Sequence, residues 1–489
     1  MKVEEIRKQG ENLISDLGKY YLRKGLGKEI KEELREIYSK YKGIFTKENI
    51  ENLKCNENLS FREKKYLLSF LFQGYIGKEC FELTREIAQR ELQTLVEVDK
   101  GEISLKYAQL LLPAEKNREK RLALDKKLGE GQAGINALRE KRVDILKRIA
   151  TDFGYRNYVE LIHDITPVNF NTLKELGKKF LTQTETKYTT LLKKLEGYYL
   201  EEGSEPLQKS DITYIFKSNP FDKYFSDIEL IPTIEDTLFR LGINILEQNN
   251  VTLSLDPKEG KAIKSFCCPV SIPDEIHLVL NPKGGIEDYQ DSLHETGHCQ
   301  HYAYTSKDLP FEYKRIGDKS VGEGYGYLFQ QLIANELWID KFLDMDEDTL
   351  TKYKVFIDGY NLYIIRRFCG KLLYELEIFS GPKEDKTLKE KYVKIMEEAV
   401  KVKVNPENYL LDLDIGFNTS NYLRAWIFES YLREYLVNNF GGLWFLKKES
   451  GDFLKNLWKS GSMYRTEEIV ENIGFKDFNI DVMIKYFVI

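Results

Sequence analysis

Residues 291–302, DSLHETGHCQHY, contain three of the five histidines in this chain of 489 residues. His294 and His298 are four residues apart, and Glu295 directly follows the first, which is the HExxH pattern. Four residues of α-helix span about 400° of rotation and about 6 Å of rise, so both imidazoles project from one face and converge on one point. We therefore expect a helix here, and the rest of the chain must fold around the point of convergence.

Two converging imidazoles beside a carboxylate are typical of a metal site. Zinc binds such nitrogens at about 2.0–2.1 Å, and a glutamate next to the first ligand can act as general base on a metal-bound water. In a chain this poor in histidine, chance would produce the motif roughly 0.005 times. The sequence therefore predicts one Zn²⁺ per chain, with His294 and His298 as ligands and Glu295 as the catalytic base.

A catalytic zinc site needs a third protein ligand and an open position. His301 lies on the same stripe of the helix as His294, but about 10 Å further along the axis, so we expect it in the core or beside the ligands. Two carboxylates compete for the third place, Asp318 and Glu323, which follow His298 by 20 and 25 residues. Glu323 is favoured because it lies in a glycine-rich helix start, and glycines that weaken a helix by about 1 kcal/mol each indicate close approach to the histidine helix.

Apolar spacing predicts a mainly α protein, since most of the chain repeats at three and four residues. Residues 275–281, EIHLVLN, alternate instead and lie between Pro273 and a turn, which predicts a short strand just before the histidine helix. Glycine and proline punctuate residues 165–225. They divide the chain into an N-terminal helical lobe, 1–200, and a zinc-binding lobe with C-terminal helices, 201–489, with a soft boundary within one continuous structural unit.

Composition excludes several classes of function. The formal net charge is −6 and 31% of residues are charged, which is typical of neither a nucleic-acid nor a membrane protein. The charged N-terminus does not resemble a signal peptide, and no apolar run approaches the roughly 18 residues of a spanning helix. The six cysteines contain no CxxC pair, which indicates reduced thiols and a cytoplasmic location. The sequence leaves the oligomeric state open.

Several segments resemble the thimet oligopeptidase and oligoendopeptidase F family of zinc peptidases. Residues 260–302 run from a glycine–lysine pair through the strand into an HExGHxxH helix, as that family's sequence does, and Glu323 lies at the family's distance from it. Residues 139–161 are similar to its N-terminal helices that end in GYxNY. The likeness covers roughly residues 115–165 and 255–470.

The carboxypeptidase Taq family is a close second, with a C-terminal pattern comparable to residues 372–381 and 409–426. Resemblance to either family implies a large, mainly α, two-lobed zinc peptidase with a deep central groove and a small β-element next to the HExxH helix. There are departures. Both families usually carry a second glutamate where this chain has Gln330, and no histidine follows His301. The late loop keeps only Tyr422 at a matching position.

These features predict a zinc metallopeptidase that cleaves internal bonds of short oligopeptides. Glu295 would take a proton from the attacking water and pass it to the leaving amine, and Tyr422 would donate a hydrogen bond to the oxyanion. The strand at 275–281 would hold the substrate as an added strand.

Two alternatives stay open. In a carboxypeptidase, Arg424 is the candidate cation for the terminal carboxylate, although its other interpretation is a helix residue paired with a nearby acid. A non-enzymatic protein would bind peptides and keep the zinc only as structure.

Overall fold

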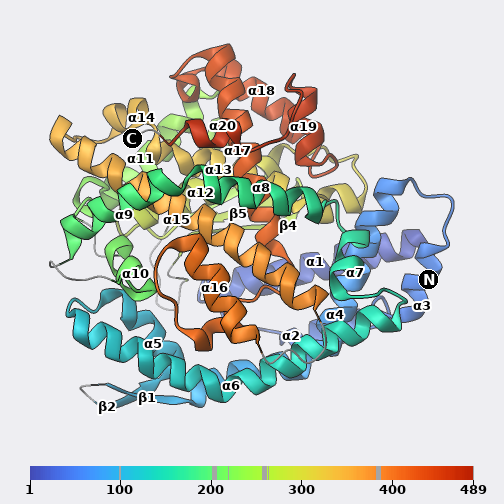
Figure 1. Ribbon diagram of the computed structural model, residues 1–489. Helices are drawn as coiled ribbons and strands as arrows, with labels where there is room; N and C mark the ends of the chain where they lie inside the picture. Colours follow the sequence, from blue (N-terminus) through green and yellow to red (C-terminus); the bar gives the residue numbers. More distant parts are fainter. Residues whose placement is uncertain are drawn as a thin grey trace.

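The computed structural model describes residues 1–98, 101–200, 206–217, 220–255, 262, 264–381 and 387–487. Within these residues the chain is mainly helical, as predicted (Figure 1). The glycine–lysine pair at Gly260 and Lys261 lies outside them.

The first half of the chain forms eleven of the helices in the described part. They are α1 (Val3–Gly25), α2 (Leu34–Lys40), α3 (Lys47–Lys54), α4 (Phe61–Gln93), α5 (Leu105–Leu111), α6 (Arg118–Asp152), α7 (Tyr158–Ile165), α8 (Phe170–Gln183), α9 (Glu185–Tyr199), α10 (Lys209–Lys217) and α11 (Asp227–Arg240). Local sequence explains their ends. Ser60 and Glu63 form a capping box at the start of α4, and Gly27, with φ +63°, follows the end of α1.

The second half supplies the helices around the predicted metal site. They are α12 (Ile286–Tyr304), α13 (Lys319–Gln330), α14 (Glu336–Phe342), α15 (Glu347–Ser380), α16 (Leu388–Val400), α17 (Asn418–Phe440), α18 (Lys448–Trp458), α19 (Thr466–Asn472) and α20 (Asp481–Lys485). A π-helical turn, Glu312–Ile316, connects α12 to α13. In Figure 1, α12 and α13 lie near the middle of the molecule, and α17 packs against α13.

Two small sheets accompany these helices. Strands β1 (Leu95–Val98) and β2 (Gly101–Ser104) form an antiparallel hairpin. The second sheet has the order β3-β5-β4, from β3 (Val251–Ser254), β4 (Phe266–Ser271) and β5 (Glu275–Val279). Strand β5 pairs in parallel with β3 and antiparallel with β4, and both β4 and β5 contact α12. This three-stranded sheet is therefore the small β-element expected next to the histidine helix.

Strand β5 confirms the strand predicted at 275–281. Its alternating side chains Ile276 and Leu278 are fully buried. However, β5 is the central strand, so both of its edges are already paired, and the prediction that it adds a substrate strand is wrong. The alternation of side chains within one strand does not show which strands pair with it. Strand β4 was not predicted because its sequence, FCCPVS, has no clear alternation of apolar and polar residues.

The main hydrophobic core is shared by the two predicted lobes. One cluster of buried side chains runs from Ile6 on α1 to Phe487 near the end of the described chain. A second, smaller cluster includes Ile87 and Leu105 beside the β1–β2 hairpin. The division near residue 200 stays a prediction.

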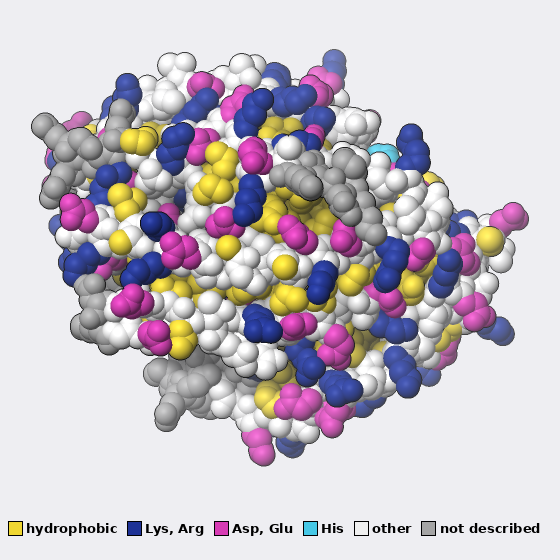
Figure 2. Space-filling view, turned by 60° about the horizontal axis from the view of Figure 1, so that its bottom comes forward, with side chains coloured by type: hydrophobic (Ala, Val, Ile, Leu, Met, Phe, Trp, Pro, Cys, Tyr) yellow, Lys and Arg dark blue, Asp and Glu magenta, His cyan; other side chains and the backbone are white. Residues whose placement is uncertain are grey.

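The surface carries charges of both signs. On the face in Figure 2, basic and acidic side chains are interspersed, with apolar side chains between them. Among the described helices, none combines the length and the apolar character needed to cross a membrane.

Candidate metal centre and active site

Helices α12 and α13 cross in close contact, and glycines make that contact possible. A Cβ atom on Gly297 would lie 2.5 Å from the carbonyl oxygen of Tyr325, and one on Gly326 would lie 2.7 Å from Cε1 of His294. Such distances leave no room for a side chain at either position. Of the glycines around Glu323, Gly326 therefore has the role expected from the sequence, since it allows α13 to approach the histidine helix, whereas Gly324 makes its tight contact with Phe428 on α17.

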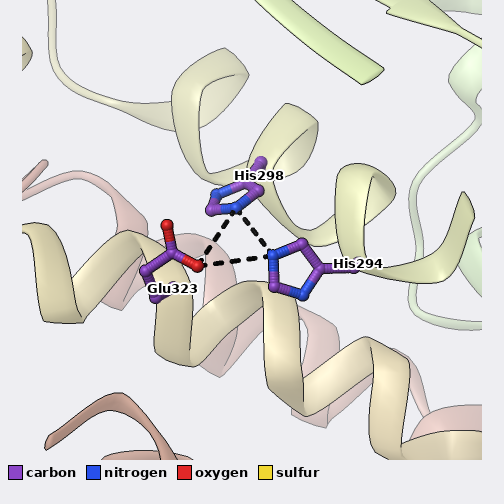
Figure 3. Close-up of side chains that lie close together, drawn as sticks. All are labelled: His294, His298 and Glu323. Atoms are coloured by element: carbon purple, nitrogen blue, oxygen red, sulfur yellow. Dashed lines mark hydrogen bonds and ion pairs between the residues drawn. The ribbon is translucent and has the colours of Figure 1, made fainter. Parts of the chain in front are cut away.

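This approach brings three potential metal ligands together (Figure 3). His294 and His298 project from α12, and Glu323 faces them from α13. The two Nε2 atoms are 3.0 Å apart. Oε2 of Glu323 lies 3.5 Å from Nε2 of His294 and 4.0 Å from Nε2 of His298. In the described part of the chain, they are the one group of three or more histidine, cysteine and acidic side chains arranged to hold a metal ion.

The spacing of these atoms fits a metal ion. Ligands at 2.0–2.1 Å in tetrahedral geometry lie about 3.3 Å from one another, and the three observed distances fall on both sides of this value. All three side chains keep some solvent access, with exposed fractions of 16%, 13% and 26%. Water can therefore reach all three side chains.

The protonation states of His298 and Glu323 also suit a metal. Burial lowers the pKa of His298 to about 3, so its imidazole is neutral, which is the form that binds metals. Burial also acts to lower the pKa of His294, but the hydrogen bond and charge of Glu323 outweigh it and the net pKa is raised. Burial acts to raise the pKa of Glu323, and its contact with His294 reverses the sign. The carboxylate is thus ionised beside two imidazoles.

The Nδ1 atoms of His294 and His298 differ in their hydrogen-bond partners. Nδ1 of His294 lies 2.9 Å from Oε1 of Gln330, one turn of α13 beyond Gly326. An amide oxygen here accepts the Nδ1 proton and leaves Nε2 for the metal. Nδ1 of His298 has no partner among the described residues. His301 is buried between Tyr302 and Tyr325, outside the cluster, as predicted for a core position.

Glu295 lies beside the cluster and is held by the neighbouring sheet. Its Oε2 accepts a hydrogen bond of 2.7 Å from the backbone N–H of Cys267 on β4, and no described residue donates one to Oε1. Burial raises the pKa of Glu295 to about 7. The chemistry available is therefore proton transfer near neutral pH. Sequence reasoning missed Cys267, because a backbone contact depends on strand placement and not on residue type.

Asp318 is not part of the metal cluster. It caps the N-terminus of α13 through Ser320 and accepts hydrogen bonds from Arg424 at 2.9 and 2.6 Å. Arg424 is also paired with Glu467 and is almost fully buried. Arg424 therefore has the second of its two predicted roles, a helix residue paired with nearby acids, because its guanidinium already forms ion pairs with Asp318 and Glu467.

Tyr422 lies on α17, which packs against α13. Its ring stacks on Phe368 with centroids 5.4 Å apart, and the side chain is half-buried. Burial and the negative charges of Glu323 and Asp414 raise the pKa of its hydroxyl to about 12. The phenol is therefore protonated and electrostatically coupled to the metal ligand.

Comparison with known proteins concerns the fold. No protein-family model matches the sequence, and no curated protein does either. Among solved structures, a Bacillus anthracis protein assigned as an oligoendopeptidase F matches 98% of this chain and 88% of its own, with a TM-score of 0.68 and 16% identity.

The chain has the oligoendopeptidase F fold. A carboxypeptidase from Pyrococcus furiosus, in its apo-Mg form, matches 99% of this chain and 97% of its own, with a TM-score of 0.59 and 13% identity. The mainly helical fold expected from the sequence agrees with both structures. The three-residue cluster lies within this fold.

Proposed function

We propose that this protein is a zinc-dependent metallopeptidase that hydrolyses internal peptide bonds of short oligopeptides. The observation that carries the proposal is the convergence of His294, His298 and Glu323 beside Glu295, in a fold similar to an oligoendopeptidase F. Two histidines and one carboxylate form the ligand set of zinc hydrolases, and a purely structural zinc site is usually closed by four protein ligands, often cysteines.

In this reaction, different residues would bind the metal, transfer the proton and stabilise the oxyanion. His294, His298 and Glu323 would hold the ion, which supplies Lewis-acid chemistry that makes water nucleophilic near neutral pH. Oε1 of Glu295 would accept the proton of the attacking water and later deliver it to the leaving amine. The hydrogen bond from Cys267 holds the other oxygen and so fixes the orientation of the base. Tyr422, being protonated, would donate to the developing oxyanion.

The substrate would lie along the outer edge of β4. Within the described residues, strand β4 is paired with β5 on one side only, and the N–H of Cys267 on its other side points to Glu295. Towards the end of the strand, Arg315 occupies the carbonyls of Pro269 and Val270. A peptide added as a strand would therefore meet the first part of β4, next to the catalytic base.

The first experiment separates metal binding from catalysis. Glu295→Gln should retain about one zinc per chain and lose at least about 100-fold in kcat, because a missing general base typically costs 10²–10⁴ in rate. Glu323→Gln should lose most of the zinc, since it removes one of three ligands. Asp318→Asn is the matched control: it should keep zinc in folded protein. Metal analysis measures the zinc content of each variant, and a peptide hydrolysis assay measures its kcat. Near-normal turnover by Glu295→Gln would instead favour a peptide-binding protein that keeps its zinc as structure.

The second experiment tests where the chain is cut. A decapeptide with a free or amidated C-terminus should be cleaved at the same internal bond in both forms, as mass spectrometry of the fragments would show. A carboxypeptidase would leave the amidated form intact and produce a ladder of single-residue losses from the free one. Because Arg424 already forms ion pairs with Asp318 and Glu467, we do not propose that it binds the terminal carboxylate of a substrate in either case.

A further inference from the structure

Lys319 stands one helical turn before the metal-ligand candidate Glu323 on α13. Four residues of helix place the two side chains on the same face, about 6 Å apart along the axis. Lys319 is exposed, and its Nζ donates a hydrogen bond of 3.3 Å to Oε1 of Gln73 on α4. The ammonium group thus extends from the helix of the proposed site towards the N-terminal helices.

The lysine has no evident structural reason to be there. The first turn of a helix favours acidic residues, because the helix dipole is positive at that end, yet α13 has a lysine and no acid in its first turn. Its one hydrogen-bond acceptor among the described residues is a neutral amide, and none of their carboxylates lies within 4.0 Å of Nζ. An ion pair within the protein therefore does not account for the charge.

The surroundings nevertheless favour an anion near this group. Burial by neighbouring atoms lowers the pKa of Lys319, while the more distant charges of Asp414 and Glu323 act in the opposite direction. Asp414 is already used within its own loop, where Oδ1 accepts from the N–H of Gly416 and from Asn418. A ligand carboxylate would give the exposed ammonium the close charged partner that the described residues do not supply.

We propose that Lys319 binds a carboxylate of the substrate peptide within about two residues of the scissile bond. This inference rests on the proposed peptidase function and makes Lys319 a specificity-determining residue. The distance follows from the helix geometry: about 6 Å from the metal-ligand position corresponds to roughly two residues of extended peptide at 3.3–3.6 Å each. The carboxylate can belong to an acidic side chain or to the C-terminus of a short peptide.

The test uses matched peptides with blocked ends. The parent is neutral, with an acetylated N-terminus and an amidated C-terminus, and its cleaved bond is mapped first. One set replaces a glutamine by glutamate at each of the two positions on either side of that bond. A second peptide is shortened so that a free C-terminus falls within two residues of the bond. Wild type, Lys319→Gln and Lys319→Glu are compared by kcat/KM, with Lys106→Gln on the distant α5 as the control for net charge.

Wild type should prefer at least one carboxylate peptide over its neutral counterpart by about 10- to 100-fold, the range of a charge-assisted hydrogen bond. Lys319→Gln should lose this preference, Lys319→Glu should prefer a lysine-containing peptide, and Lys106→Gln should behave as wild type. Preference within the glutamate set identifies an acidic side chain, and preference for the shortened peptide identifies the terminus.

A preference that survives in Lys319→Gln, or no preference in wild type, would overturn the assignment. Calorimetric binding of the same peptides to Glu295→Gln gives a readout that does not depend on turnover. If no peptide is hydrolysed by wild type but the carboxylate preference appears in binding, the proposed function fails while the role of Lys319 stands. If the neutral peptide is cleaved without any carboxylate preference, the reverse holds.

Discussion

Glu375 is a fully buried carboxyl group on α15 whose charge the protein does not neutralise. Its Oε1 accepts from the N–H of Asp414 and from the hydroxyl of Thr419, and Oε2 has no partner among the described residues. Burial raises its pKa from 4.5 to about 8. The protonated acid is therefore the form that the fold stabilises, and it holds the loop before α17, which carries Tyr422.

This group predicts a pH dependence of stability. Since the folded pKa lies above the unfolded value, its contribution is fully present below pH 4.5 and is lost as the pH rises through about 8. Each pKa unit corresponds to about 1.4 kcal/mol. Glu375→Gln, which cannot ionise, should show a flatter decline in unfolding free energy between pH 5 and 9 than wild type. Urea unfolding across this range measures it, and parallel curves for the two proteins would contradict the assignment.

At the level of single residues, sequence predicted what local geometry determines. The spacing of His294 and His298 on one helix follows from 3.6 residues per turn, and it indicates the candidate metal site without knowledge of the fold. The partners of Arg424 and Glu375 come from segments 39 or more residues away. No pattern within one segment indicates such contacts, because they depend on how helices pack.

At the level of elements, the crossing of α12 and α13 should be intolerant of even one added carbon atom. Gly297→Ala would place a methyl group within 3 Å of the backbone of Tyr325 and Gly326. We expect it to cost about 1–3 kcal/mol of stability and to lower zinc occupancy, since the ligands are on both helices. Thermal unfolding with and without a chelator, together with metal analysis, measures both effects.

Gly134→Ala on α6 is the matched control. This glycine is also helical, but a Cβ atom there meets nothing within 4 Å. The substitution should stabilise the protein by about 0.4–1 kcal/mol, because alanine loses less conformational entropy in a helix. Equal destabilisation by the two alanines would mean that helix propensity, and not the crossing, accounts for the result.

The elements themselves were predictable to different degrees. Strand β5 was found because a half-buried strand alternates, and the 34 residues of α15 fall in the part predicted to be helical. Near the N-terminus the helical part is divided between α1 and α2, and Gly27, which follows the end of α1, adopts a positive φ. The role of β5 as a central strand needed the identity of its neighbours, which only the folded chain provides.

At the level of the whole molecule, α1 is joined to the site region by a buried ion pair. Arg7 binds both carboxylate oxygens of Glu312, which has no solvent exposure. Arg7→Met should cost about 3 kcal/mol, because it leaves a buried charge without its partner. The double variant Arg7→Met, Glu312→Gln should recover most of this loss, as denaturant unfolding can establish.

Arg85→Met is the corresponding control, since Arg85 and Glu82 form an ion pair on the surface with both side chains more than 60% exposed. It should cost under about 1 kcal/mol. If Arg7→Met were as mild as Arg85→Met, α1 would be held by its apolar contacts alone.

The order of the metal ligands along the chain has a consequence for assembly. Closing the 25-residue loop between His298 and Glu323 costs about 3 kcal/mol of chain entropy, whereas bringing Tyr422 to His294 closes 128 residues and costs about 4 kcal/mol. The N-terminal Gln73, the partner of Lys319, lies further away still. The metal-binding part of the centre is thus the low-contact-order part, which favours its formation ahead of the substrate-facing part that needs both ends of the chain in place.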